Sequence, residues 1–225
     1  MRTPIILINF KNYEKAVGKN AVKLAKICEK VAKETRTNIV AVVNPIDLRA
    51  VASSVKIPVF AQHIDPIEYG KHTGHILPEL VKQAGAKGTL INHSEFRLQP
   101  DQIKKAVKRA KLLKLTTVVC ASTPKIAAAV AKFHPDFIAI EPPELIGSEK
   151  SVSSAKPEII LKTIAMVRKV AKIPVICGAG VKDKNDVIVA LKLGSVGVLA
   201  ASHIAQASNP EKPLRELALG TKHGT

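Results

Sequence analysis

Three side chains that could take part in acid–base or carbonyl chemistry stand just after short apolar segments of the chain. Glu141 follows such a segment directly. A carboxylate at the end of a buried strand is desolvated, so its pKa rises and it becomes a usable base. Lys11 could clamp a negative charge or form a Schiff base, and His93 could donate a proton or a hydrogen bond. Taken singly, Lys11 is more simply a surface lysine, and a polar capping role suits His93 equally well.

Two turns of small residues form a candidate anion-binding site. Residues 178–180 read Gly-Ala-Gly and residues 200–202 read Ala-Ala-Ser, each after an apolar segment. Small residues leave backbone N–H groups open to an anion, and in a parallel barrel the last two such loops are the usual phosphate site. The first turn is not a dinucleotide fingerprint, because Asp183 stands where a third glycine is required.

The stretch after Glu141 has the features of a hinged lid. Pro142 and Pro143 stiffen the backbone directly behind the carboxylate, and Gly147 permits a turn. A lid of this kind would close over a bound substrate and exclude water from the reaction.

The scaffold that would bring these residues together is indicated by an alternation along the chain. Short β-branched runs, apolar throughout as in strands buried on both faces, alternate with longer amphipathic stretches. Pro45, Pro124 and Pro157 are expected in first helical turns, with Asn44 and Thr123 as caps. The expected strands are residues 5–9, 39–43, 59–62, 89–92, 117–120, 137–140, 175–177 and 196–200. The expected helices are residues 19–34, 45–54, 76–84, 100–114, 124–132, 157–171, 184–193 and 211–219.

Eight strand–helix units in 225 residues leave about 28 residues per unit, close to the ~30 of one βαβ step. This repeat predicts an α/β fold in the form of a (β/α)8 barrel of parallel strands. It favours this closed barrel more than an open doubly wound sheet. No linker or composition break divides the chain, so residues 1–225 are expected to form a single domain. The active site is expected at the C-terminal ends of the strands.

The charge of the chain invites a nucleic-acid interpretation, which its composition disfavours. The formal net charge is +17, but 28 of the 35 basic residues are lysines and aromatic residues make up only 3%. Arginine is the bidentate reader of phosphates and guanines, and aromatic rings stack on single strands. We therefore expect no nucleic-acid partner, although a positive field would help to draw in an anionic substrate.

The cysteines and histidines point to neither a disulfide framework nor a metal. Cys28, Cys120 and Cys177 are odd in number and lack a Cys-x-x-Cys spacing, so they are expected to pack as small apolar residues in a reducing cytoplasm. His63, His72 and His75 share one segment, but polar loop contacts are the favoured interpretation over a metal site. The N-terminal apolar stretch is too short for a signal peptide or membrane span, so no membrane partner is expected.

Taken in their order along the chain, the motifs described above resemble those of the triosephosphate isomerase family, and the resemblance covers nearly the whole chain. Each motif is weak alone, but jointly they are highly specific. The short chain and the form of residues 141–147 look like the archaeal branch of the family. The motifs that carry the resemblance are Asn9-x-Lys11, His93-Ser94-Glu95, Glu141-Pro142 with Ile146-Gly147, and the turns at 178–180 and 200–202.

The resemblance implies an isomerase of glycolysis and gluconeogenesis, without a cofactor or metal, that interconverts D-glyceraldehyde 3-phosphate and dihydroxyacetone phosphate. It implies that Glu141 is the base and His93 the electrophile. It implies that Lys11 and Asn9 contact substrate oxygens. The substrate- and phosphate-binding residues that it implies are Asn9, Phe10, Lys11, Ile146, Gly147, Gly178, Gly180, Ala201 and Ser202.

The resemblance also implies an assembly and supporting residues. Glu95 would pair with Lys11, and Thr73 would reach into the site of a neighbouring subunit of a cytoplasmic homo-oligomer, a tetramer rather than a dimer. Two rival functions stay open at this point. One is a phosphosugar aldolase on the same barrel that uses Lys11 as a Schiff-base amine, and the other is a basic nucleic-acid-binding protein.

Overall fold

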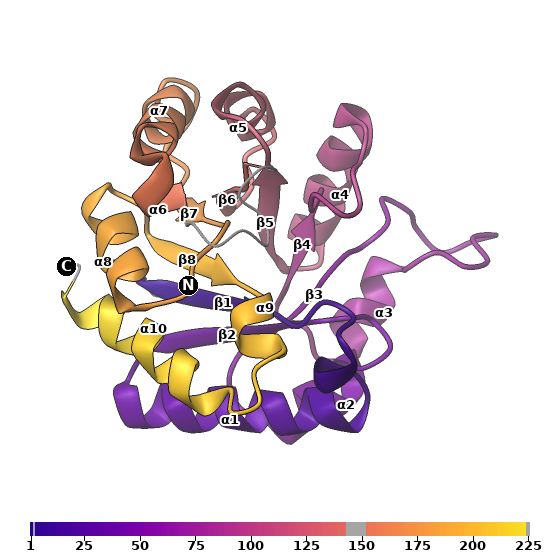
Figure 1. The fold of residues 1–225 in the computed structure, drawn as a ribbon. Coiled ribbons are helices and arrows are strands. Elements are labelled where there is room, and N and C mark those ends of the chain that lie inside the picture. The colour runs from indigo at the N-terminus through magenta and orange to yellow at the C-terminus, as the bar shows by residue number, and fades with distance from the viewer. Residues whose placement is uncertain (2, 143–151, 224–225) are drawn as a thin grey trace.

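The computed structural model describes residues 1, 3–142 and 152–223. Within these residues, eight parallel strands close into a barrel in chain order, with β1 paired to both β2 and β8 (Figure 1). The fold predicted from the sequence is confirmed. The strands are β1 (Ile5–Asn9), β2 (Asn38–Val43), β3 (Val59–Ala61), β4 (Gly88–Ile91), β5 (Thr116–Ala121), β6 (Phe137–Ile140), β7 (Val175–Cys177) and β8 (Gly197–Ala200).

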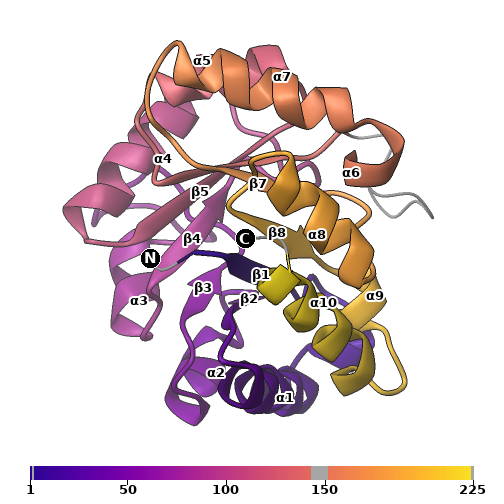
Figure 2. The same cartoon turned by 90° about the vertical axis from the view of Figure 1, so that its left-hand side faces the viewer.

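The helices surround these strands, as Figure 2 shows, with the strands near the centre of the view. The expected helices are all present in the described part of the chain, and their ends differ by at most four residues from the prediction. Three short helical segments were not expected: η1 (Glu14–Ala16), α6 (Val152–Ala155) and α9 (Ser202–Ala205). The others are α1 (Lys19–Thr35), α2 (Leu48–Ser54), α3 (Pro78–Gln83), α4 (Pro100–Leu112), α5 (Pro124–Ala131), α7 (Pro157–Arg168), α8 (Lys184–Lys192) and α10 (Glu211–His223).

Prolines and capping side chains explain where several helices begin, and one predicted helix start is wrong. Pro124 and Pro157 occupy first turns as predicted, and the Thr123 hydroxyl accepts a hydrogen bond from the Ile126 amide at 3.2 Å. The prediction for Pro45 is wrong, because α2 begins only at Leu48.

The residue before Pro45 explains the late start of α2. The side-chain oxygen of Asn44 accepts a hydrogen bond from the Asp47 amide at 2.9 Å, and its amide group donates to Asp47 Oδ2 at 2.8 Å. These bonds close residues 44–47 into a turn through the Asn44 side chain, and the Val51 amide then bonds the Asp47 carbonyl oxygen at 2.9 Å where α2 begins.

Alternate residues of each strand face the barrel interior. In β6, Phe137 and Ala139 belong to the interior apolar cluster, whereas Ile138 and Ile140 belong to the cluster packed against the surrounding helices. The next inward position after Ala139 is Glu141. Strand periodicity therefore aims this carboxylate into the mouth of the barrel, above the apolar interior.

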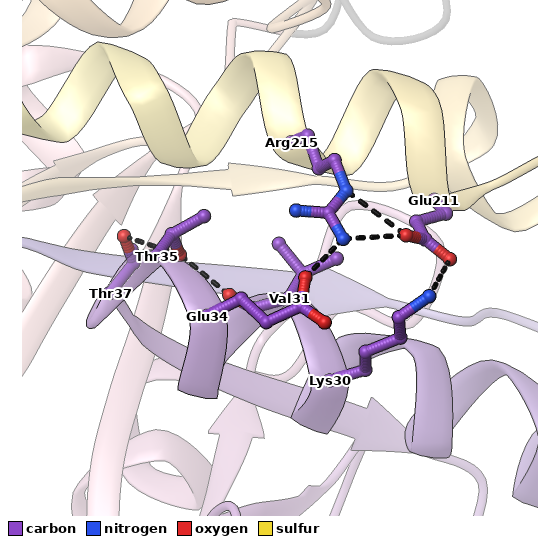
Figure 3. A network of polar contacts seen from close by, with 7 residues as sticks. All are labelled: Lys30, Val31, Glu34, Thr35, Thr37, Glu211 and Arg215. Atoms are coloured by element: carbon purple, nitrogen blue, oxygen red, sulfur yellow. Dashed lines mark hydrogen bonds and ion pairs between the residues drawn. The ribbon is translucent and has the colours of Figure 1, made fainter.

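The last helix is joined to the first by an ion-pair network, which Figure 3 shows. From α10, Arg215 bonds both Glu211, one turn earlier, and Glu34 of α1. Glu211 also accepts a hydrogen bond from Lys30 of α1 at 3.0 Å. Exposed pairs of this kind contribute about 0–1 kcal/mol each, so the network orients α10 more than it stabilises the fold.

Gly197 allows β8 to approach β1 and close the barrel. A Cβ atom at this position would lie 2.1 Å from the carbonyl oxygen of Ile5, its partner in the ladder. We expect Gly197→Ala to lower the free energy of unfolding by about 3 kcal/mol, because the backbone has to shift. Urea unfolding measures this change. Ser195→Ala is the control, since Ser195 Oγ is buried without a hydrogen-bond partner in the described part of the chain, and its loss is expected to change stability by less than about 1 kcal/mol.

Candidate active site

The C-terminal ends of the strands enclose a small pocket of about 60 Å³. It brings together Lys11, His93 and Glu141, which come from the ends of β1, β4 and β6. Of the predicted phosphate-binding residues, Gly178, Gly180, Ala201 and Ser202 line the same pocket. A hollow of about 440 Å³ adjoins it, shares Lys11 and His93, and is also lined by Asn9, Gln62, His63 and Glu95.

Glu141 is the buried carboxylate of the pocket, with 2% of its surface exposed. Burial raises its pKa to about 7, against the opposing effects of Cys120, Lys11 and Arg97. Among the described residues, Glu141 Oε2 has no hydrogen-bond partner. A carboxylate with this pKa and a free oxygen can accept a proton near neutral pH.

His93 faces Glu141, and its hydrogen bonds define which nitrogen carries the proton. His93 Nε2 lies 3.6 Å from Glu141 Oε1, and His93 Nδ1 accepts a hydrogen bond from the Glu95 amide at 3.3 Å. Burial lowers the pKa of His93 to about 4, although nearby Glu95 acts to raise it. The ring is therefore neutral at physiological pH, with its proton on Nε2, pointing into the pocket.

Lys11 adopts a left-handed backbone conformation, with φ of 51°. Its amide donates to Asn9 Oδ1 at 3.0 Å and its carbonyl oxygen accepts from Gln62 Nε2 at 3.0 Å. Such a conformation costs about 1–2 kcal/mol in an L-residue, and these two bonds hold it in place. Lys11 Nζ lies 2.6 Å from Glu95 Oε1, which places the predicted Glu95 pairing at the site.

Two positioning residues of the site were not predicted from the sequence. Gln62 comes directly after β3, so its place at a strand end was the available signal. Asn92, directly before His93, has a φ of 63°, accepts from the Leu98 amide at 2.9 Å and donates to the Cys120 carbonyl oxygen at 2.9 Å. Asparagine tolerates this conformation better than most residues, so Asn92 sets the direction in which the chain presents His93.

Tyr13, Lys182 and His203 also line the pocket without having been predicted. Lys182 and His203 lie within two residues of the predicted turns at 178–180 and 200–202, which was the signal for them.

Some of the predicted site residues lie elsewhere. The Phe10 side chain is fully buried in the apolar core, and its amide bonds the Val42 carbonyl oxygen at 2.9 Å, so neither faces the pocket. Thr73 is exposed on the segment between β3 and α3 and lines neither the pocket nor the hollow. Ile146 and Gly147, with the rest of the predicted lid from Pro143, lie outside the described residues.

The histidine cluster makes polar loop contacts, as expected. His63 Nε2 lies 3.2 Å from Asp65 Oδ1, and His75 Nδ1 lies 3.4 Å from Asp65 Oδ2. Across the residues that the structure describes, no group of three or more His, Cys, Asp or Glu side chains is arranged to hold a metal ion. The three cysteines, Cys28, Cys120 and Cys177, are fully buried free thiols, as predicted.

Gly178 leaves the space that the Glu141 side chain occupies. A Cβ atom at position 178 would lie 2.7 Å from Glu141 Cγ and 3.1 Å from the Ile140 carbonyl oxygen. We expect Gly178→Ala to displace the carboxylate and lower kcat about 10²-fold, the cost of misplacing a reacting group by about 1 Å. Steady-state kinetics measures the effect, with thermal unfolding as a check of the fold. An unchanged kcat in a folded variant would contradict this role of Gly178.

Comparison with known proteins identifies the family. A sequence model of the family described as triosephosphate isomerase matches residues 4–217. The chain belongs to the triosephosphate isomerase family. The triosephosphate isomerase of Methanobacterium bryantii is 50% identical over 216 residues, which cover 96% of each chain. That of Metallosphaera sedula is 48% identical over 220 residues, which cover 98% of this chain and 96% of the relative.

These matches confirm the resemblance and the isomerase activity expected from the sequence. Nothing in them favours the aldolase or the nucleic-acid-binding protein. In the described part of the chain, no helix is both long enough and apolar enough to cross a membrane.

Proposed function

We propose that Glu141, His93 and Lys11 carry the isomerase reaction of this chain between D-glyceraldehyde 3-phosphate and dihydroxyacetone phosphate. The observation that supports it best is the 3.6 Å approach of His93 Nε2 to Glu141 Oε1 in a buried pocket that Lys11 also lines. A coupled assay that starts from D-glyceraldehyde 3-phosphate tests the proposal. We expect rapid formation of dihydroxyacetone phosphate, and a folded protein without this activity would contradict it.

Glu141 acts as the base. Its ionised carboxylate takes a proton from the carbon next to the substrate carbonyl. The electron pair of that C–H bond forms the C=C bond of an enediolate, and the π pair of the carbonyl group moves onto its oxygen. The hydroxyl proton then passes to the former carbonyl oxygen, between the two oxygens that His93 faces, and Glu141 returns its proton to the neighbouring carbon, which completes the interconversion. The free Oε2 and the raised pKa of Glu141 suit both steps, because the group has to be a base first and an acid afterwards.

His93 and Lys11 stabilise the negative charge that develops on the two substrate oxygens. The neutral His93 ring donates a hydrogen bond from Nε2, and the Lys11 ammonium, paired with Glu95, supplies a fixed positive charge. Donors that are already oriented need no rearrangement as the charge forms, which is why such groups contribute strongly to catalysis. The side-chain oxygen of Asn9 accepts a hydrogen bond from the Lys11 backbone amide and so holds Lys11 in place. Asn9 also contacts substrate oxygens from the adjoining hollow.

The substrate phosphate lies against the backbone amides near Gly180, Ala201 and Ser202. These small residues line the same pocket as Lys11, whose ammonium balances part of the phosphate charge. Gly178 lines this wall as well. Ile146 and Gly147, which lie outside the described residues, are part of the proposal as further phosphate-binding residues. The reaction needs no cofactor or metal in this scheme.

The pH profile of kcat/KM follows from these assignments. Glu141 has to be ionised, so kcat/KM is expected to rise with pH through a midpoint near pH 7. His93, with a pKa of about 4, stays neutral over that range and adds no second inflection above pH 5. Stopped-flow or coupled assays between pH 5 and 9 measure the profile. A midpoint below pH 5 would contradict the raised pKa of Glu141.

The wider setting of the enzyme forms part of the proposal. Residues 1–225 act as one barrel domain in the cytoplasm, in glycolysis and gluconeogenesis, as an archaeal-type homotetramer. The exposed Thr73 on a projecting segment supports an assembly in which each subunit reaches toward the site of another. Sedimentation velocity tests the tetramer directly, and an active monomer would contradict it.

A further inference from the structure

The pocket at the C-terminal ends of the strands contains a second lysine, to which the proposed reaction gives no role. Lys182 follows the turn at 178–180 by two residues and lines the pocket together with Lys11, Ala201 and Ser202. Among the described residues that line this pocket, Lys11 and Lys182 are the two lysines. Lys182 therefore places a further cation beside the turns that we assign to the substrate phosphate.

The backbone of Lys182 is held by Asp186, a buried residue in the first turn of α8. The Lys182 amide donates to Asp186 Oδ2 at 3.0 Å. The Asp186 amide in turn donates to Oδ1 of Asp183, the N-cap of α8, at 2.9 Å. These bonds fix the turn that leads from Gly180 into α8. Because its amide is already bonded, the donor that Lys182 can offer to an anion is its side-chain ammonium.

Asp186 also joins this turn to α6. Ser153 of α6 is buried, and its hydroxyl donates to the Asp186 carbonyl oxygen at 3.0 Å. Two elements, α6 and α8, thus brace the backbone from which the Lys182 side chain extends. A side chain on a braced backbone loses less conformational freedom when it binds a ligand.

The charges in the pocket favour a second cation for the phosphate. Lys11 Nζ lies 2.6 Å from Glu95 Oε1, so part of its positive charge is already balanced. Glu141 carries a negative charge whenever it is ionised to act as the base. A phosphate monoester adds a charge of about −1.5 to −2 at pH 7. With Lys11 as its only cation, the pocket would therefore be strongly negative once the substrate is bound.

Lys182 is better placed for this role than His203, the other basic residue of the described lining that the reaction does not use. His203 is exposed in α9, whereas Lys182 is half-buried. A charge that is partly withdrawn from water interacts more strongly with a neighbouring charge, because less solvent screens the pair. Lys182 is thus the stronger partner for the phosphate.

We propose that Lys182 is a specificity-determining residue, whose ammonium binds the substrate phosphate and makes the enzyme select phosphorylated trioses over unphosphorylated ones. The inference rests on the proposed function and adds a side chain to its phosphate site. The phosphate takes no part in the proton transfer, so Lys182 binds the substrate and the transition state equally well. Uniform binding of this kind lowers KM and leaves kcat unchanged.

Two substitutions at position 182 test the proposal, with one matched control. Lys182→Gln removes the charge, and Lys182→Arg keeps it. Lys184→Gln removes the same charge two residues later, at the start of α8, from a half-buried lysine that does not line the pocket. For each full-length variant, kcat and KM are measured with D-glyceraldehyde 3-phosphate, and kcat/KM is measured with unphosphorylated D-glyceraldehyde. The inhibition constant of inorganic phosphate and the thermal unfolding of each variant are measured as well.

We expect Lys182→Gln to raise KM for D-glyceraldehyde 3-phosphate about tenfold at unchanged kcat. This is the lower end of what a hydrogen bond to a charged group contributes, because Lys182 is only half-buried. The inhibition constant of inorganic phosphate should rise by about the same factor, and kcat/KM with D-glyceraldehyde should not change. Lys182→Arg should restore most of the affinity, and Lys184→Gln should match the parent protein.

A measurement on the parent protein tests the same contact without a substitution. Reductive methylation labels lysine amines, and mass spectrometry reads the extent of labelling at each position. Inorganic phosphate should slow the labelling of Lys182 and leave that of Lys184 unchanged. Equal labelling of Lys182 with and without saturating phosphate would overturn the proposal.

The kinetic results can also overturn it. A folded Lys182→Gln protein with the parent KM contradicts the contact. An equal loss of kcat/KM with both substrates indicates a structural role instead. If Lys184→Gln raises KM as much as Lys182→Gln does, the overall positive charge of the protein accounts for the effect.

The parent protein separates this inference from the proposed function. A parent that neither turns over D-glyceraldehyde 3-phosphate nor binds inorganic phosphate overturns both. An active parent that inorganic phosphate inhibits, but whose Lys182 is neither protected from labelling nor sensitive to substitution, overturns the role of Lys182 alone.

Discussion

Replacing Glu141 with glutamine is expected to lower kcat about 10²–10⁴-fold, the range that a positioned general base contributes. The glutamine side chain has nearly the same shape but cannot accept the substrate proton. Binding of a phosphate-bearing substrate analogue should change little, because the phosphate lies against the turns at 178–180 and 200–202. Steady-state kinetics and analogue titration measure the two effects. A Glu141→Gln protein with the parent rate would remove the assignment of the base.

The same substitution is expected to stabilise the fold. The pKa of Glu141 is about 7 in the folded protein and near 4.5 when the group is exposed, so burial favours its protonated form. Its stabilising contribution is complete below pH 4.5 and is lost as pH rises through about 7. Above pH 7, Glu141→Gln removes a buried charge and should gain about 1–3 kcal/mol in the free energy of unfolding. Loss of stability instead would indicate a structural role for the carboxylate.

Lys11→Ala is expected to lower kcat about 10²–10³-fold and to raise KM, since the loss of one preoriented donor to a developing charge costs about 2.7–4 kcal/mol. Glu95, its partner, is largely exposed and can be hydrated, so the fold should remain intact. Lys19→Ala, an exposed lysine on α1, carries the same change in charge and should leave both constants unchanged. Equal effects from the two variants would show that Lys11 acts only through the overall positive charge of the protein and not through its position in the pocket.

Lys11 also separates an isomerase from a Schiff-base enzyme. An isomerase that uses Lys11 only as a fixed charge forms no covalent bond to it. Borohydride treatment in the presence of dihydroxyacetone phosphate should therefore leave no reduced adduct on the protein. A stable adduct on Lys11 would contradict the proposed role.

The fold could be predicted because its determinants are local. Each strand is a short apolar run buried on both faces, and the unit length repeats eight times, so the pattern defines the barrel without any knowledge of contacts. Pro45 shows the limit of such patterns. A proline after asparagine is compatible with a helix start, but Asn44 folds back on Asp47 instead, and α2 begins three residues later than predicted.

The pocket was partly predictable because parallel strands end on one side of the barrel. Polar residues at those ends, such as Lys11 and Glu141, therefore meet whatever their separation in sequence. Phe10 also follows a strand end, but the strand alternation turns its side chain into the core. A position at a strand end is therefore not enough to predict a site residue. The direction in which its side chain points has to be known as well.

Contacts between distant polar residues could not be read from the sequence. Arg109 bonds Glu79 and Glu68, which lie 30 and 41 residues away in the sequence, and each residue type is common on exposed helix faces. The proton position on His93 depends on a hydrogen bond from the Glu95 backbone, which no side-chain pattern reports. Both depend on three-dimensional geometry.

Turnover of D-glyceraldehyde 3-phosphate in deuterated water tests the central claim most directly. If Glu141 carries the proton between adjacent carbons, part of it exchanges with solvent while bound to the carboxylate. The product should then contain solvent deuterium at the carbon that receives the proton, and Glu141→Gln should incorporate it at least 10²-fold more slowly. A product without solvent deuterium, or the same rate of incorporation in the variant, would contradict proton transfer through Glu141.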